Sequence, residues 1–185
     1  MQGFEAAKVW TGAGLGWVMA PERSMSLHLE TERLVMRPWV ASDVGEYRAL
    51  VTERGGGVPA VENIQERIES QLAATARTGI ALLTLRRRVE GDFIGYCGLI
   101  IGRASLDEPE IAYELFQRVH GFGYATEAAR AVLDAAIAGG WTRLWSTVGA
   151  WNAPSLRVLE KLGFEQDRVE EGDRGGLVWL TRTLP

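Results

Sequence analysis

A pair of glycines directly before an alanine-rich segment constrains this chain more than any other feature of its sequence. Residues 120–140 read HGFGYATEAARAVLDAAIAGG. Small apolar residues recur in this stretch at the spacing of one helical face, namely Ala125, Ala129, Val132 and Ala136. The spacing predicts a helix that begins at Gly123 or Tyr124 and ends at the glycine pair 139–140.

The start of this predicted helix is suited to an anion. The first N–H groups of a helix have no intrahelical partner, and the aligned peptide dipoles place partial positive charge at that end. Gly121 and Gly123 allow a positive φ and a close approach of the backbone, and Thr126 adds a hydroxyl in the first turn. We therefore expect a ligand that carries phosphate.

Two common nucleotide-binding motifs fit this stretch poorly. A dinucleotide-binding fold would place a third glycine or alanine at position 126, where threonine stands, and an acidic residue about 20 positions further on. Residues 143–148 contain no acid. A phosphate-binding P-loop would need Gly-Lys followed by Ser or Thr, which the sequence lacks. A nucleotide-dependent oxidoreductase is the weaker hypothesis for these reasons.

The composition of the whole chain limits the fold and the function. With 185 residues, 46% hydrophobic and 24% charged, the chain is long enough for one globular domain with a substantial core. A net charge of −4 argues against nucleic acid as the main partner. The single cysteine, Cys97, allows no internal disulfide and is expected in a buried strand. One cysteine and two histidines favour no metal site.

The first 26 residues differ from the rest and are expected to form an N-terminal extension. The glycine-rich, half-apolar segment 9–20 is too short and too interrupted to span a membrane, and Glu5 before it argues against a signal peptide. We expect residues 27–185 to form a single domain in a cytoplasmic protein without a membrane partner. The two tryptophans of the extension are expected to pack on the domain or on a second subunit, so a homodimer is a possible assembly.

Apolar patterns along the domain predict a mixed α/β chain. Strands are expected within 29–36, 80–85, 93–101, 110–115, 141–148, 165–169 and 177–184, and helices after residue 42 or 43, across 61–72 and after residue 152. Asp43 and Glu46 have the spacing of a helix capping box. The basic triplet 86–88 is expected to be a solvated edge of a hairpin.

The predicted strand 110–115 leads directly to the glycine loop. Its residues alternate, with Ile111, Tyr113 and Leu115 on one face and Glu110, Ala112 and Glu114 on the other. A strand that runs into such a loop brings its C-terminal end next to the anion site. Side chains at that end are therefore candidates for ligand contact.

The glycine stretch resembles the acyl-CoA pyrophosphate motif of the GNAT N-acetyltransferase superfamily, Gln/Arg-x-x-Gly-x-Gly/Ala. The fixed positions of this motif correspond to His120, Gly123 and Ala125, and an overlapping match runs from Arg118 through Gly121 and Gly123. Histidine stands where arginine or glutamine is usual, and Phe122 stands where a basic residue is frequent. Arg118 is a candidate to supply the missing positive charge.

A second run, NAPSLRVLEKLGF at 152–164, is similar to the other GNAT signature, Asn-x-x-Ser followed by Glu-Lys-x-Gly-Phe. The start of the domain, 31–43, resembles the ribosomal-protein N-acetyltransferase (RimJ/RimL-like) branch. The resemblance covers about residues 27–184 and implies the GNAT fold. This α/β (α+β) fold has a central mixed, mostly antiparallel twisted sheet of about seven strands flanked by helices.

The resemblance also implies a reaction and a set of binding residues. The cosubstrate would be acetyl-CoA, without a metal, and the acetyl group would pass to a primary amine by direct attack in a ternary complex. The acceptor would be a protein N-terminus or a small-molecule amine. The implied cofactor-binding residues are Leu115, Phe116, Arg118, His120, Gly121, Phe122, Gly123, Tyr124, Ala125, Thr126, Asn152 and Ser155.

The catalytic roles implied are those of a base and of a donor to the departing thiolate. Glu110 is the first candidate for the base, with Glu114 as the alternative, and Ser155 is the candidate donor. Alanine at 112 and glutamate at 114 depart from the residues usual in the superfamily. Because His120, Phe122 and Ala112 all depart from the usual residues, a catalytically idle acyl-CoA-binding or interaction module is the alternative, and it would release no thiol with any amine.

Overall fold

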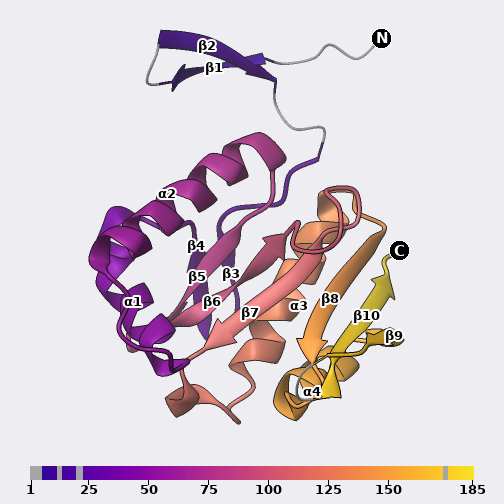
Figure 1. Ribbon diagram of the computed structural model, residues 1–185. Coiled ribbons are helices and arrows are strands. Elements are labelled where there is room, and N and C mark those ends of the chain that lie inside the picture. The colour runs from indigo at the N-terminus through magenta and orange to yellow at the C-terminus, as the bar shows by residue number, and fades with distance from the viewer. Residues whose placement is uncertain (1–5, 12–13, 20–22, 173–174) are drawn as a thin grey trace.

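The chain folds around one twisted sheet of eight strands, in the order β3-β4-β5-β6-β7-β8-β10-β9, shown in Figure 1. This computed structural model describes residues 6–11, 14–19, 23–172 and 175–185. The strands of the sheet are β3 (Leu29–Glu30), β4 (Leu34–Arg37), β5 (Leu82–Arg87), β6 (Phe93–Ile100), β7 (Glu110–Leu115), β8 (Arg143–Gly149), β9 (Glu165–Glu170) and β10 (Leu177–Thr183). The helices are α1 (Val44–Glu53), α2 (Val61–Thr78), α3 (Tyr124–Ala138) and α4 (Ala153–Lys161).

The mixed, mostly antiparallel sheet expected from the sequence is confirmed. It has one strand more than expected, because the apolar run 29–36 is a short hairpin rather than one strand. Leu29 pairs with Met36 and Glu30 with Val35 across a turn at 31–33. The neighbouring strands β7 and β8 are parallel, and every other pair of neighbouring strands in the sheet is antiparallel.

Two apolar clusters hold the helices to the sheet. Residues of α1 and α2, with Trp39 and Phe93, form the smaller cluster. The larger cluster contains most of the sheet and α3, which runs behind the strands in Figure 1. The predicted face of α3 is buried at Ala129, Val132 and Ala136, each 0% exposed. Small residues on this face let the helix axis lie close to the sheet.

The predicted apolar stripe of α2 is buried only in its middle. Ile64 and Ile68 are 0% and 2% exposed, whereas Val61 and Leu72 are 40% and 39% exposed. The helix therefore covers the sheet through its central turns. Periodicity predicted the correct face of the helix but not how far the contact extends.

The parallel neighbours β7 and β8 diverge toward their C-terminal ends. Among the described residues they pair at one position, Glu110 with Trp145, near the start of β7. Figure 1 shows the two arrows separating beyond that point, with α4 near the lower end of β8. Because α3 follows β7 and α4 follows β8, the N-terminal ends of both helices come to this opening. The fold thus creates a gap in the sheet that is flanked by two helix starts.

The N-terminal part contains a separate two-stranded sheet, β1 (Ala6–Thr11) with β2 (Gly14–Met19). The main domain begins slightly before residue 27, because Met25 is buried in the large cluster and its N–H donates to the carbonyl of Gly79 at 2.9 Å. The expectations about the tryptophans and Glu5 of the extension concern side chains outside the described residues. In the part of the chain that the structure describes, no helix has the length and apolar character needed to cross a membrane.

Asp43 does not cap α1 in the way its spacing with Glu46 predicts. It is the last residue of a 3₁₀ turn, Ala41–Asp43, and its carboxylate accepts the N–H of Val40 at 2.9 Å. The same carboxylate pairs with Arg37 at 2.7 Å and with Arg86 at 3.1 Å. Asp43 is the N-cap residue of α1, as the sequence predicted, but the capping box with Glu46 is wrong because the Asp43 carboxylate makes no bond to the first turn of α1 and closes the earlier turn instead.

The sequence predicted that the basic triplet 86–88 is a solvated edge of a hairpin, and the structure shows instead that all three arginines form ion pairs. Arg86 contacts Asp43 and Glu46, whereas Arg87 pairs with Glu90 and Asp92 in the turn between β5 and β6. Arg88 pairs with Glu30 of β3. Each arginine is therefore occupied by a carboxylate from a neighbouring element, which the linear sequence could not indicate.

Replacing Asp43 by asparagine is expected to destabilise the protein by about 3 kcal/mol, because Arg37 and Arg86 would lose a buried partner. Burial alone would raise the pKa of the Asp43 carboxyl, but hydrogen bonds from Arg37, Val40 and Arg86 together hold its pKa below 3.8. Since the folded pKa is lowered, this stabilisation is complete above about pH 5 and is lost as the pH falls below about 4.

Urea unfolding at pH 7 and pH 3 checks this prediction. The difference in unfolding free energy between the parent and Asp43→Asn should be larger at pH 7 than at pH 3. An equal difference at both pH values would contradict the ionic role of Asp43.

Candidate active site

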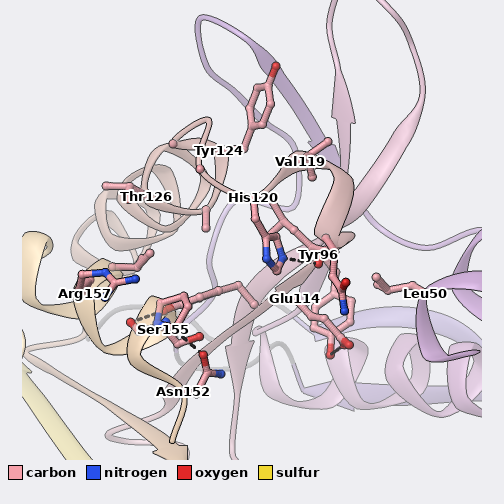
Figure 2. A pocket seen from close by; sticks show the side chains of 18 of the residues that line it. Leu50, Tyr96, Glu114, Val119, His120, Tyr124, Thr126, Asn152, Ser155 and Arg157 are labelled. Carbon is pink, nitrogen blue, oxygen red and sulfur yellow. Dashed lines mark hydrogen bonds between the residues drawn. The ribbon is translucent and has the colours of Figure 1, made fainter. Parts of the chain in front are cut away.

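A cavity of about 900 Å³ opens where β7 and β8 diverge, and Figure 2 shows its lining. One end is formed by the end of α1 and the neighbouring part of the sheet, and the other by the starts of α3 and α4. The lining residues are Leu50, Glu53, Arg54, Tyr96, Tyr113, Glu114, Leu115, Gln117, Val119, His120, Gly121, Gly123, Tyr124, Ala125, Thr126, Trp151, Asn152, Pro154, Ser155, Arg157, Val158 and Lys161.

The glycine loop has the conformation that its sequence predicts. Gly121 and Gly123 have φ values of +83° and +84°, a region that residues with a Cβ atom rarely adopt. Gly123 is the N-cap residue of α3, which begins at Tyr124 as expected. The first turn of α3, through Thr126, lines the cavity. The start of a 15-residue helix therefore presents its N–H end to this space.

Two residues from the start of the domain hold the glycine loop in position. Thr31 donates its hydroxyl hydrogen to Glu127 of α3 at 2.6 Å, and Arg33 donates from Nε to the same carboxylate at 2.7 Å. Arg33 also donates from Nη1 to the carbonyl of Phe122 at 3.0 Å. Burial would raise the pKa of Glu127, but these hydrogen bonds together lower it. These contacts tie the stretch 31–33 to the glycine loop and the first turn of α3.

The positive charges beside this loop come from α4, not from Arg118. Arg157 and Lys161 line the cavity, and Figure 2 shows Arg157 on the side where Thr126 lies. Arg118 instead pairs with Asp92 at 2.9 Å and donates to the carbonyl of Phe93 at 2.9 Å. Sequence reasoning missed the two α4 residues, although their spacing of four places them on one helical face.

Phe116 and Phe122 do not line the cavity. The N–H of Phe116 donates to the carbonyl of Ile94 at 3.0 Å, and its ring packs edge-on against Phe93, with centroids 6.0 Å apart. Phe122 is 64% exposed on the outer side of the loop. Of the predicted cofactor-binding set, the cavity thus brings together Leu115, His120, Gly121, Gly123, Tyr124, Ala125, Thr126, Asn152 and Ser155.

The structure does not bring Glu110 to the cavity. Glu110 lies at the start of β7, far from the diverging ends, and is 3% exposed. Its carboxylate accepts the N–H groups of Arg103 and Ala104 and the hydroxyl of Thr147, the last at 2.8 Å. These contacts fasten the loop before β7 to β8. The geometry therefore does not support Glu110 as the base, and it separates Glu110 from Ser155.

Glu114 lines the cavity at the end formed by α1. Arg54, just after α1, donates from both Nε and Nη2 to this carboxylate. Tyr96 of β6 donates its hydroxyl hydrogen to Glu114 at 2.8 Å, and Arg54 Nη2 donates to the Tyr96 oxygen at 2.9 Å. Burial, with the adjacent Glu114 carboxylate, raises the pKa of Tyr96. This group was not predicted because its three residues are distant in the sequence.

His120 closes the turn between β7 and the glycine loop. Because a carbonyl oxygen can only accept, the 2.9 Å contact between Nε2 and the carbonyl of Leu115 makes Nε2 the donor. Figure 2 shows the ring inside the cavity, between Tyr124 and Glu114. The ring therefore forms part of the wall between the two ends of the cavity.

Asn152 and Ser155 lie at the start of α4, where the sequence predicted a cap. The side-chain oxygen of Asn152 accepts the N–H of Ser155 at 3.3 Å, which confirms the cap. The hydroxyl of Tyr113 on β7 donates to the carbonyl of Ser155 at 3.0 Å. This bond ties the two sides of the opening together and holds Ser155 at the cavity wall.

A reactive cysteine and a metal site are the other kinds of chemistry that the sequence raised. Cys97 is buried in β6 as predicted, and burial raises the pKa of its thiol. Such a thiol is a poor nucleophile. Within the described ranges, no group of three or more His, Cys, Asp or Glu side chains could hold a metal ion.

Comparisons with known proteins agree with this geometry. A family model described as acetyltransferase (GNAT) domain matches residues 33–165. The uncharacterized protein YkkB of Bacillus subtilis (strain 168) is 32% identical over 93 residues, which cover 49% of this chain and 54% of that protein. The match thus spans about half the length of that relative.

Two solved structures are also similar. An acetyltransferase from Agrobacterium tumefaciens str. C58 has a TM-score of 0.70 and 28% identity, over 84% of this chain and 93% of its own. The ribosomal L7/L12 alpha-N-protein acetyltransferase RimL, in complex with coenzyme A, has a TM-score of 0.73 and 14% identity, over 85% of this chain and 98% of its own. At 14% identity the second likeness concerns the fold alone.

Proposed function

The chain belongs to the GNAT acetyltransferase family, and on this premise we propose that it transfers an acetyl group from acetyl-CoA to a primary amine by direct attack in a ternary complex. One observation carries the proposal. A single cavity joins the glycine loop and the N–H end of α3, at Gly121 to Thr126, to an end that contains the carboxylate of Glu114. The resemblance of residues 31–43 to the ribosomal-protein N-acetyltransferase branch favours an α-amine as the acceptor.

The residues present fit coenzyme A. Its diphosphate would bind the N–H groups after Gly121 and Gly123, with Arg157 and Lys161 nearby to balance the charge. Its pantetheine arm would lie along Leu115 toward Asn152. RimL, which shares the fold, is a coenzyme A complex, and this supports the same ligand here.

The acceptor amine must lose a proton before it can attack. An alkyl ammonium has a pKa near 10.4, so about one molecule in 10³ is unprotonated at neutral pH, whereas an α-amine has a pKa near 8. We propose that Glu114 accepts this proton, directly or through water, because Glu114 rather than Glu110 lines the cavity. Bound acetyl-CoA supplies an activated acyl group as its thioester. Ser155 is proposed to donate a hydrogen bond to the departing sulfur.

A thiol-release assay tests the proposed function. The purified chain is incubated with acetyl-CoA and panels of amino acids, peptides, polyamines and aminoglycosides, and free thiol is measured beside the acetylated amine. Thiol and product should form in equal amounts and only when amine is present. Tight binding of coenzyme A without thiol release from any amine would instead support a catalytically idle acyl-CoA-binding module.

Replacing Ser155 by alanine is expected to lower kcat by about 10- to 100-fold, because the departing thiolate would lose its donor. The Kd for coenzyme A should change by less than about twofold, since the remaining cavity wall is unaltered. Steady-state kinetics and calorimetric titration measure the two quantities. Ser42→Ala is the matched control because Ser42 is exposed and outside the cavity. A loss confined to affinity would move Ser155 to the binding residues.

A further inference from the structure

At the end of the cavity formed by α1, side chains of opposite charge keep hydrogen-bond donors and acceptors that have no partner within the described part of the protein. Arg54 occupies Nε and Nη2 with Glu114 and Tyr96. Among the residues that the structure describes, its Nη1 atom, with two N–H groups, has no hydrogen-bond partner. The side chain as a whole is 42% exposed and lines the cavity.

The carboxylates at the same end also have unused capacity. Glu114 accepts three hydrogen bonds, from Arg54 twice and from Tyr96 once, and a carboxylate can accept about four. Glu53 accepts the N–H of Gln117 through Oε1 at 2.6 Å, and its Oε2 has no partner in the described part of the chain. Both glutamates line the cavity, and the negative end of the α1 dipole adds to them.

From this arrangement we infer that the acceptor is a small zwitterion, an α-amino acid or a similar amino-carboxylate. Its carboxylate would bind the free edge of Arg54, and its amine would bind Glu114 and Glu53. This inference rests on the proposed function, because it names the substrate class of the same site. It makes Arg54 a residue that determines acceptor specificity.

The charges distinguish a zwitterion from other amines. A polyamine would bring further positive charge close to Arg54 with no carboxylate to offset the repulsion, which is costly in a partly buried site. A protein N-terminus or an amino-acid amide presents an amine without a neighbouring carboxylate, so Nη1 would gain no charged partner. A free amino acid would pair its carboxylate with Arg54 and its amine with the two glutamates, without breaking the Arg54–Glu114 pair. A guanidinium suits this role because its Nη1 donors remain for a second carboxylate while Nε and Nη2 hold Glu114 and Tyr96.

Matched pairs of acceptors test the inference. The rate of thiol release is measured for a panel of L-amino acids and for the amide of each, with spermidine and a short peptide in parallel. The kcat/KM of the best amino acid should exceed that of its amide by at least about tenfold, the loss typical of a missing charged hydrogen bond. Spermidine and the peptide should also be slower than that amino acid.

Arg54→Met should reduce the ratio of acid to amide to about one, mainly by lowering kcat/KM for the acid. The Kd for coenzyme A should not change, and thermal unfolding checks that the variant is folded. Arg54→Lys keeps the charge but not the planar edge, so it should retain part of the preference. Arg48→Met is the matched control, because Arg48 lies on α1 outside the cavity and donates to the carbonyl of Pro59. It should leave the ratio unchanged.

The outcomes separate this inference from the proposed function. A preference for amides, peptides or spermidine over free amino acids would overturn the inference while leaving acetyl transfer intact. An unchanged ratio of acid to amide in both Arg54 variants would also overturn it. Failure to release thiol with every amine would overturn the proposed function itself.

Discussion

Replacing Gly123 by aspartate is expected to raise the Kd for coenzyme A at least about 100-fold, equivalent to about 2.7 kcal/mol. Gly123 caps α3 with φ at +84° and lies on the cavity wall. Aspartate tolerates this backbone conformation better than most residues, so the loop should keep its shape. An added Cβ at Gly123 would lie 3.6 Å from Nη2 of Arg33, so the carboxylate would sit at the loop beside the proposed diphosphate site and would repel the diphosphate by its charge. Isothermal titration with coenzyme A measures the change.

The matched control for this variant is Gly140→Asp. Gly140 follows the other end of α3, with φ at +85°, and no atom lies within 4 Å of the position of an added Cβ. It therefore receives the same substitution with a similar backbone cost, away from the cavity. Its Kd for coenzyme A should stay within about twofold of the parent value. If Gly123→Asp also bound coenzyme A as the parent does, the diphosphate could not lie on this loop.

Replacing Gly98 by alanine is expected to destabilise the domain by at least about 3 kcal/mol and to lower Tm by about 6 to 12 °C. Gly98 of β6 faces β5 so closely that a Cβ atom would lie 1.9 Å from the carbonyl oxygen of Ala81 and 2.8 Å from the Cα atom of Leu82. These are backbone atoms, so no side chain can move aside. The two strands would have to separate in the centre of the sheet, and thermal unfolding measures the result.

Gly45→Ala provides the opposite control. Gly45 lies in the first turn of α1, and no atom lies within 4 Å of the position of an added Cβ. Alanine should therefore raise the unfolding free energy by up to about 1 kcal/mol through helix propensity. If Gly98→Ala unfolded at the parent temperature, the close approach of β5 and β6 at this point would be incorrect.

The elements that the sequence predicted well are those determined by local chemistry. The start of α3 follows from Gly123 and the alanine spacing, and the start of α4 follows from the Asn152 cap with proline in its first turn. The end of α4 follows from Gly163, with φ at +74°. In each case the residues that decide the conformation are within one or two turns of each other. A local pattern is then sufficient.

The position of the candidate base illustrates what local patterns miss. Alternation in β7 correctly places Glu110 and Glu114 two strand repeats apart, and the glycine loop correctly indicated that the C-terminal end of the strand lies at the site. The sequence did not indicate that β7 and β8 stay paired at Glu110 and Trp145 and open only beyond them, so Glu110 at the start of the strand was still the first candidate. Glu110 therefore lies buried and binds the loop before β7, whereas Glu114 lines the cavity. Arg54, Tyr96 and Arg157 join it from elements far apart in the chain.

By itself, the sequence of this protein determined its fold family, its glycine loop and its helix caps, because these depend on backbone conformations that particular residues allow or forbid over a few positions. Only the tertiary structure decided which charges share the cavity. Charge pairing acts through space between α1, β6, β7 and α4, and side chains tens of residues apart meet only once the sheet has formed, with β7 and β8 diverging.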